Sequence, residues 1–264
     1  MKKWVKILSW VLGVAFLITI IGFVSVKRRG AVCTKITVKI KDSTGEHLID
    51  ENEILGLIER PGANVINKPV DEINIAKIEK RVDAYSFVKH AEVYIDIDGE
   101  MIAEIAPRIP VVRVCNRLNQ QYYIDNEGCL MPASINHPVR LLVANGNISH
   151  KPRFDTVFSI YNKKFDKRID IKTLRDIHTL ASFIKSKPFW NAQIQQIYVN
   201  NDDEIELSPL VGDQNIVLGP VDNLEDKFRK LEAFYKKGMP VSGWNTYKEI
   251  NLKYKNQVVC VKRD

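Results

Sequence analysis

Residues that could support catalysis or metal binding are scattered along this chain of 264 residues. The histidines lie far apart, and His178, in a stretch with helical periodicity, has no second histidine three or four residues away. The cysteines form neither a CxxC pair nor a cluster with histidine, which argues against a zinc site. Motifs of the GxGxxG, P-loop, HExxH and GxSxG types do not occur. The sequence therefore predicts no catalytic, cofactor-binding or metal-binding residues, no small-molecule substrate and no enzyme activity.

Two acidic stretches begin like metal loops but are better explained as turns. Asp96-Ile97-Asp98-Gly99 starts as a calcium loop does, yet the distal ligands of an EF-hand do not follow at the required spacing. Asp125 to Gly128 has the same interpretation. Cys115 and Cys129 flank a predicted hairpin, and an extracytoplasmic location would permit a disulfide between them. Free buried thiols are the favoured interpretation, and the pairing stays open.

The two closing strands offer a different chemistry, the backbone pairing of a sheet edge. We expect strands at 247–254 and 257–262, joined by Lys255-Asn256. A late strand of an antiparallel sheet can leave N–H and C=O groups free for a strand of another protein. The lysines of this region equally suit an edge that is blunted against pairing, and from the residues alone that interpretation is favoured. Trp244 is expected to cap the core or, alternatively, to anchor a partner.

The pattern of predicted helices and strands indicates an α+β chain. A strand at 36–40, two helices and a hairpin at Asp98-Gly99 give the order β-α-α-β-β over residues 36–106. Asp50 followed by Glu53 has the pattern of a capping box at the first helix. A mixed β-domain with antiparallel strands follows, with flanking helices expected at 170–186 and 223–237.

The amino terminus has the pattern of a single membrane anchor. Residues 7–26 contain no charged residue, and a helix of this length spans about 30 Å, the thickness of a bilayer's hydrocarbon core. The apolar core of a cleaved signal peptide is usually shorter, about 7–15 residues. Lysines and arginines flank both ends, so the positive-inside rule does not orient the helix. Residues 1–29 contribute six of the seven net positive charges. Residues 30–264 are therefore nearly neutral overall and lack the excess of basic residues that nucleic-acid binding requires.

Three motifs give this order of elements a family resemblance. They are Val88-Lys89-His90-Ala91-Glu92-Val93, Arg108-Ile109-Pro110 and Tyr122 to Gly128. Together with the anchor they resemble the bacterial cell-division proteins of the FtsQ/DivIB family, in which a POTRA domain precedes a β-domain. The resemblance implies a non-catalytic divisome scaffold at the septum, without cofactors. It also implies a cytoplasmic amino terminus and an extracytoplasmic, periplasmic bulk at the inner (plasma) membrane.

The domain boundaries expected on this basis are as follows. They delimit a short cytoplasmic tail (1–6), a transmembrane helix (7–26), a juxtamembrane linker (27–35), a POTRA-like domain (36–107) and a β-domain with partner-binding strands at its end (108–264).

The resemblance also favours an open edge at the last strands, where the family binds FtsB, which acts with FtsL. The lysine-or-arginine-then-tyrosine pair of the family corresponds to Lys253-Tyr254. The residues expected to contact a partner are Ile250, Leu252, Lys253, Tyr254, Lys255, Asn256 and Gln257, with Trp244 as a further anchor. Two other classes remain open: a POTRA-containing component of a secretion or outer-membrane assembly system, and an anchored extracytoplasmic enzyme or sensor.

Overall fold

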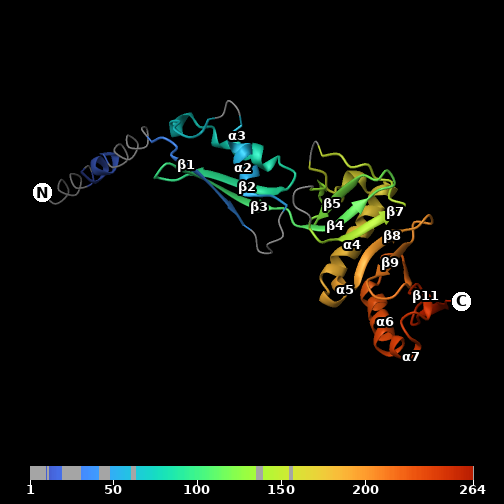
Figure 1. Cartoon of the computed structure of the whole chain (residues 1–264). Coiled ribbons are helices and arrows are strands. Elements are labelled where there is room, and N and C mark those ends of the chain that lie inside the picture. Colours follow the sequence, from blue (N-terminus) through green and yellow to red (C-terminus); the bar gives the residue numbers. More distant parts are fainter. Residues whose placement is uncertain are drawn as a thin grey trace. The chain divides into compact units, whose positions relative to one another are not determined.

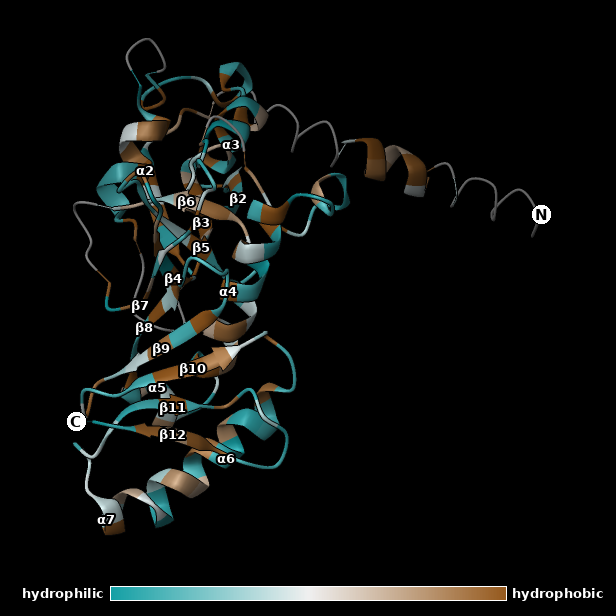
Figure 2. Ribbon diagram, turned by 90° about the vertical axis from the view of Figure 1, so that its right-hand side faces the viewer, coloured by the Kyte–Doolittle hydropathy of each residue, from teal (hydrophilic) through white to brown (hydrophobic). Residues whose placement is uncertain are grey.

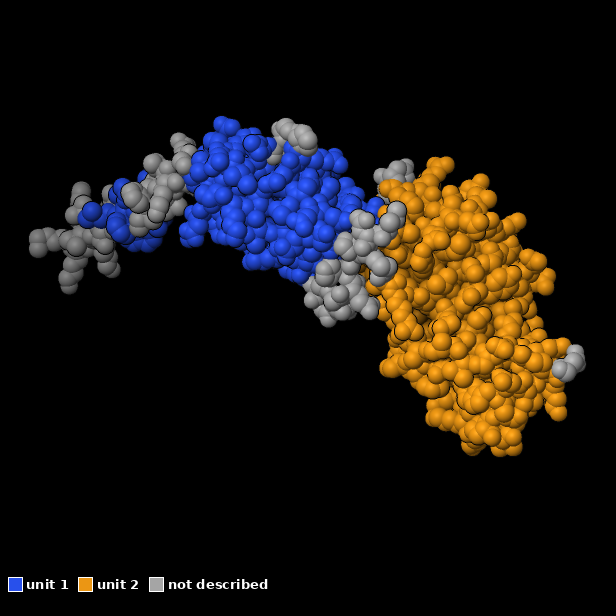
Figure 3. Space-filling view, in the orientation of Figure 1, with its two compact units in different colours: residues 1–45, 49–107 blue, residues 46–48, 108–264 orange. Residues whose placement is uncertain are grey.

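The computed structural model describes residues 10, 12–19, 31–41, 48–60, 64–134, 139–154 and 157–263. The chain forms two compact units, one made of residues 1–45 and 49–107 and the other of residues 46–48 and 108–264 (Figure 3). The expected tail, most of the expected membrane span and residues 27–30 of the expected linker lie outside the described residues. Residues 12–19 are helical, and within the described ranges no helix has the length and hydrophobicity needed to cross a bilayer.

The first unit has the predicted β-α-α-β-β order. Its elements are β1 (Lys35–Ile40), α2 (Glu51–Ile58), the 3₁₀ turn η1 (Val70–Glu72), α3 (Ile75–Asp83), β2 (Val88–Ile95) and β3 (Glu100–Pro107). The strands form a sheet in the order β1-β3-β2, with β1 parallel to β3 and β2 antiparallel to it. Figure 1 shows both α-helices on the same side of this sheet.

Local signals explain where these elements begin and turn. The Asp50 carboxylate accepts a hydrogen bond of 2.8 Å from the Glu53 N–H, so the expected cap of α2 is confirmed. Asp96 Oδ1 accepts bonds from the N–H groups of Asp98 and Glu100, and Gly99 has a φ of +81°. The stretch at Asp96 is therefore a hairpin turn, as predicted, because a left-handed residue there favours glycine.

The second unit is built on a nine-stranded mixed sheet in the order β12-β11-β10-β9-β8-β7-β4-β5-β6. Its strands are β4 (Pro110–Cys115), β5 (Gln121–Asp125), β6 (Leu130–Pro132), β7 (Leu142–Gly146), β8 (Ile194–Val199), β9 (Ile205–Pro209), β10 (Asn215–Gly219), β11 (Tyr247–Asn251) and β12 (Val259–Lys262). Its helices are η2 (Lys163–Phe165), α4 (Ile169–Lys185), α5 (Pro188–Gln193), α6 (Leu224–Lys237) and α7 (Met239–Ser242). The two long helices, α4 and α6, occupy the predicted stretches, whereas α5 and α7 were not expected.

The core of this unit forms where α4 and α6 bury their apolar faces. Leu174 and Ile177 of α4 and Phe228 and Leu231 of α6 belong to one buried cluster with residues of the sheet. Trp190, 4% exposed, joins the helices, since its ring lies 5.2 Å from Phe228. An aromatic ring at such a junction contributes both buried area and favourable edge contacts.

A buried ion pair joins two of the sequence motifs. Arg108 Nη1 lies 2.8 Å from Asp125 Oδ2, and the two side chains are 8% and 1% exposed. The other carboxylate oxygen accepts bonds from the N–H groups of Glu127 and Cys129. Asp125 is therefore a fully bonded turn residue, as its sequence context predicted, and its buried charge is paired.

His178 completes this network from α4. Its Nε2–H donates to the Asp125 carbonyl oxygen at 2.9 Å, and its Nδ1 accepts a bond of 2.7 Å from the Tyr161 hydroxyl. Burial lowers the pKa of His178, because a charged imidazolium would lose its hydration. All four cysteines are free thiols, Cys129 buried and Cys115 half-buried.

Candidate partner-binding interface

Strand β12 forms one edge of the large sheet, followed inward by β11, β10 and β9. Strand β11 lies between β10, to which it is parallel, and β12, to which it is antiparallel (Figure 2). The helix α6 forms the crossover that returns the chain beside β10. Parallel neighbours require such a crossover, so β11 is placed inside the sheet and not at its edge.

Two of the residues expected at the open edge therefore belong to the core. Ile250 and Leu252 have no exposed surface, and the Leu252 N–H donates to the Val217 carbonyl at 2.9 Å. The expectation that they face a partner on a free strand is wrong, because β10 on one side and β12 on the other already pair with β11. The strand also ends at Asn251 and not at Tyr254 as expected.

The free edge is instead the outer side of β12. Arg263 N–H donates to the Thr246 carbonyl at 2.9 Å, which places its amide toward β11. Backbone groups alternate along a strand, so those of Cys260 and Lys262 face away from β11. In the described part of the chain no other segment bonds to them. The outer side of β12 thus presents unpaired donors and acceptors.

The exposed side chains of this strand are two valines and Lys262. Val259 and Val261 are 39% and 40% exposed and lie on the same face of the strand. Cys260 points to the opposite face, against the core, and burial raises the pKa of its thiol. β-branched residues at an exposed edge are suited to strand pairing, and Lys262, at the end of the strand, is the one side chain of β12 of the type that protects edges.

The remaining predicted residues gather in the connection between β11 and β12. Tyr254 is 48% exposed, and Lys255, Asn256 and Gln257 are exposed as well. Asn256 has a φ of +59°, a left-handed conformation that Asn tolerates in a tight turn. The chain therefore brings these four residues together beside the amino-terminal end of β12.

Lys253 and Trp244 are engaged within the chain. Lys253 Nζ lies 2.9 Å and 3.1 Å from the two carboxylate oxygens of Glu204, and this bond raises the pKa of Lys253. Trp244, 37% exposed, lies in the loop before β11 and packs edge-on against Tyr235, with the ring centres 5.2 Å apart. Trp244 thus caps the aromatic core while part of its ring remains at the surface.

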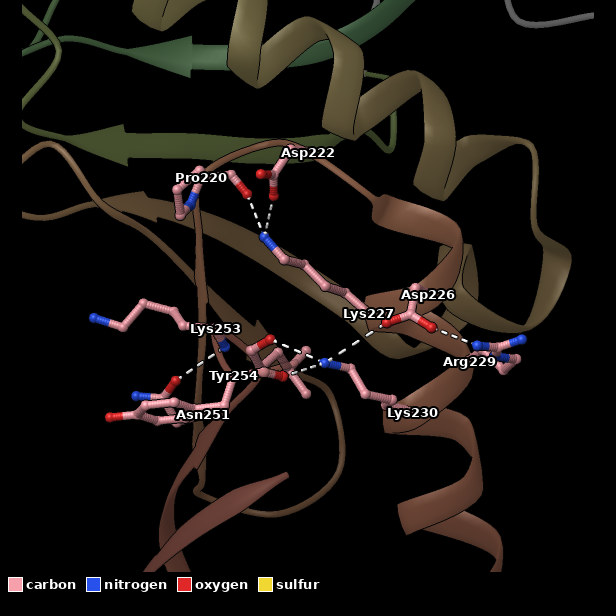
Figure 4. A network of polar contacts seen from close by, with 10 residues as sticks. Pro220, Asp222, Asp226, Lys227, Arg229, Lys230, Asn251, Lys253 and Tyr254 are labelled. Atoms are coloured by element: carbon pink, nitrogen blue, oxygen red, sulfur yellow. Dashed lines mark hydrogen bonds and ion pairs between the residues drawn. The ribbon is translucent and has the colours of Figure 1, made fainter. Parts of the chain in front are cut away.

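A recess of about 490 Å³ lies between this connection and the start of α6. Lys227 Nζ donates to the Pro220 carbonyl and to Asp222 Oδ1, and the second bond lowers the pKa of Asp222 (Figure 4). Lys230, one turn later on α6, points its amine at the connection. Four lysines and two aspartates line the recess, so its charge is positive on balance.

The sequence interpretation anticipated neither buried lysine, Lys230 at the connection nor Lys227 at the turn before α6, because lysines on a helix are usually solvated. A signal for Lys227 was present. It lies three residues after Leu224 and four before Leu231, within the apolar stripe of α6. Val259 and Val261 were missed as edge residues because the sequence does not state which of the last two strands is outermost.

Comparison with known protein families agrees with this architecture. The POTRA-like domain family matches residues 31–106, and the family described as FtsQ/DivIB, C-terminal related matches residues 109–261. No curated protein matches the chain. Since the second match covers more than half of the sequence, the chain belongs to the FtsQ/DivIB, C-terminal related family.

Proposed function

We propose that this protein is a non-catalytic, membrane-anchored scaffold of the bacterial cell-division machinery, and that the outer edge of β12 binds a strand of an FtsB/FtsL-like protein. The observation that carries the proposal is the unpaired backbone of Cys260 and Lys262 on an edge strand that also exposes Val259 and Val261. Family membership supports the cellular context, because FtsQ/DivIB domains are those of cell-division scaffolds.

Strand addition explains how such an edge recognises a partner. The partner's main chain bonds to the outward N–H and C=O groups, and its alternate side chains lie beside Val259 and Val261 on one face and beside Cys260 on the other. Tyr254 and Lys255 to Gln257, which precede the strand, are positioned to contact partner residues that flank the paired stretch.

Anchoring gives the scaffold its effect. In this proposal residues 7–26 hold the chain in the inner (plasma) membrane, with the amino terminus in the cytoplasm and both units outside. Proteins confined to one membrane and bound to one scaffold meet at a higher effective concentration than free molecules do. No chemical step is required, so co-localisation is the function.

Photocrosslinking in cells tests this proposal. A benzoylphenylalanine at Val261 is expected to capture an FtsB/FtsL-like protein, identified by mass spectrometry. The matched control is the same probe at Ile169, which is 75% exposed at the first residue of α4, a helix that contacts β4 in the other half of the sheet from β12. Equal capture from both positions, or capture of no division protein from Val261, would contradict the proposal.

A further inference from the structure

Lys230 is held by the segment that connects β11 to β12. Its Nζ lies 2.6 Å from the Tyr254 carbonyl oxygen and 3.3 Å from that of Leu252 (Figure 4). The side chain is only 13% exposed, with Asp226 Oδ2 3.8 Å away. Lysine is almost never buried without partners, so these carbonyls determine where the amine lies.

The segment it holds has few other backbone bonds. The Lys253 N–H donates to Asn251 Oδ1 at 3.1 Å, residues 255–256 form a tight turn, and within the described chain no segment outside this connection bonds to the backbone of residues 255–258. The Lys253 side chain passes over Gly219, whose φ is +70° and where a Cβ would lie 2.6 Å from Lys253 Cγ, and continues to Glu204. Lys230 is thus the bond that ties the Tyr254 backbone to α6 while the Tyr254 ring stays half-exposed.

We propose that Lys230 is a positioning residue for partner binding: it orders residues 252–258 before a partner arrives, and so presents Tyr254 and the start of β12 in the bound geometry. The inference rests on the proposed function of the β12 edge. A segment that is already ordered loses less conformational freedom on binding, which strengthens binding without any new contact.

Lys227 provides a matched control on the same helix. Its side chain is 7% exposed, and its amine donates at 2.6 Å to the Pro220 carbonyl and at 2.7 Å to Asp222 Oδ1. These acceptors precede α6 and do not belong to residues 252–258. Loss of either lysine amine leaves acceptors unbonded and lowers stability, but only the loss of Lys230 releases the Tyr254 segment.

The experiment compares Lys230→Met, Lys230→Arg and Lys227→Met in the full chain. Hydrogen exchange of residues 252–258 is measured on the detergent-solubilised protein, and capture by the Val261 photocrosslinker is measured in cells. We expect Lys230→Met to speed exchange in this segment and to lower capture at least threefold. Lys230→Arg, which keeps donors at this position, should bring exchange and capture most of the way back to those of the unmodified chain. Lys227→Met should leave exchange and capture near those of the unmodified chain, despite a loss in Tm similar to that of Lys230→Met.

Two results would overturn the role of Lys230. One is a loss of capture that follows Tm equally in Lys230→Met and Lys227→Met, which indicates a purely structural lysine. The other is faster exchange in Lys230→Met with unchanged capture. Absence of capture from the unmodified chain carrying the Val261 probe would instead contradict the proposed function, so the two failures are distinguishable.

Discussion

Strands β2 and β12 both lie at the edge of a sheet, yet only one of them is open. In the first unit the Ala91 N–H donates to Asp83 Oδ1 at 2.7 Å and the Val93 N–H to Glu79 Oε2 at 3.1 Å. Both carboxylates come from α3 and bond to the side of β2 that faces away from β3. In the second unit, no described side chain bonds to the outward backbone groups of β12.

This difference shows that a neighbouring helix, and not the strand itself, decides whether an edge is available. β2 has eight residues and β12 four, so length alone would favour β2 for pairing. Asp83 lies at the last residue of α3, where a negative charge is unfavourable to the helix dipole. Its bond to Ala91 N–H explains what offsets that cost and leaves β2 protected against strand addition.

Closing the β12 edge should have the largest effect. In Lys262→Pro the outward N–H is replaced by a ring, whereas the bonds from β12 to β11 remain, because they belong to the alternate residues. We expect capture by the Val261 photocrosslinker to fall about a hundredfold, about 2.7 kcal/mol in binding. The stability measured by urea unfolding should change by less than about 0.5 kcal/mol.

Val261→Pro is the matched variant for this prediction. Its ring removes a bond to β11 and should lower stability by about 1 kcal/mol or more. A Lys262→Pro chain that captures the partner as well as the unmodified chain would show that β12 is not the docking edge.

Opening the β2 edge should have the next largest effect. In the double variant Glu79→Ala with Asp83→Ala, two outward amides lose their acceptors. We expect faster hydrogen exchange at Ala91 and Val93 and a loss of stability of about 1 kcal/mol for each carboxylate, since both are partly exposed. Glu72→Ala, an exposed acidic residue of the same unit, is the control. Unchanged exchange in the double variant would mean that α3 covers the edge sterically and that its carboxylates are dispensable.

A smaller effect is expected from mild acid, which should lower the stability of the second unit and not that of the first. Burial holds the pKa of His178 below its ordinary value of about 6.5, so the unfolded chain binds the proton more readily than the folded one. Stability is therefore complete above about pH 6.5 and falls as the pH drops from there toward the lowered folded pKa, by up to about 1.4 kcal/mol per pH unit.

Urea unfolding at pH 7.5 and 5.5 checks this prediction, with hydrogen exchange reporting each unit separately. The second unit should lose stability at pH 5.5 and the first should not. His178→Gln should reduce the pH dependence of the second unit. An unaltered slope in that variant would assign the acid sensitivity to another group.

Much of the fold was predictable because its signals are local. The capping pair at Asp50 and Glu53 and the turns at Gly99 and Asp125 appear in the structure where the sequence placed them. The candidate interface was predictable only to its region of the chain. Tyr254 and its three following residues are exposed as expected, but Ile250 and Leu252 are buried, since a strand's alternation is the same whether one or both of its edges are paired.

The kind and order of the elements follow from the sequence, because side-chain periodicity and turn chemistry act over a few residues. Which edge is open follows only from the folded arrangement. The crossover through α6 buries β11 beside β10, the carboxylates of α3 cover β2, and Lys230 reaches carbonyls 22 and 24 residues further along the chain. These contacts depend on elements that meet only after folding, and no local pattern records them.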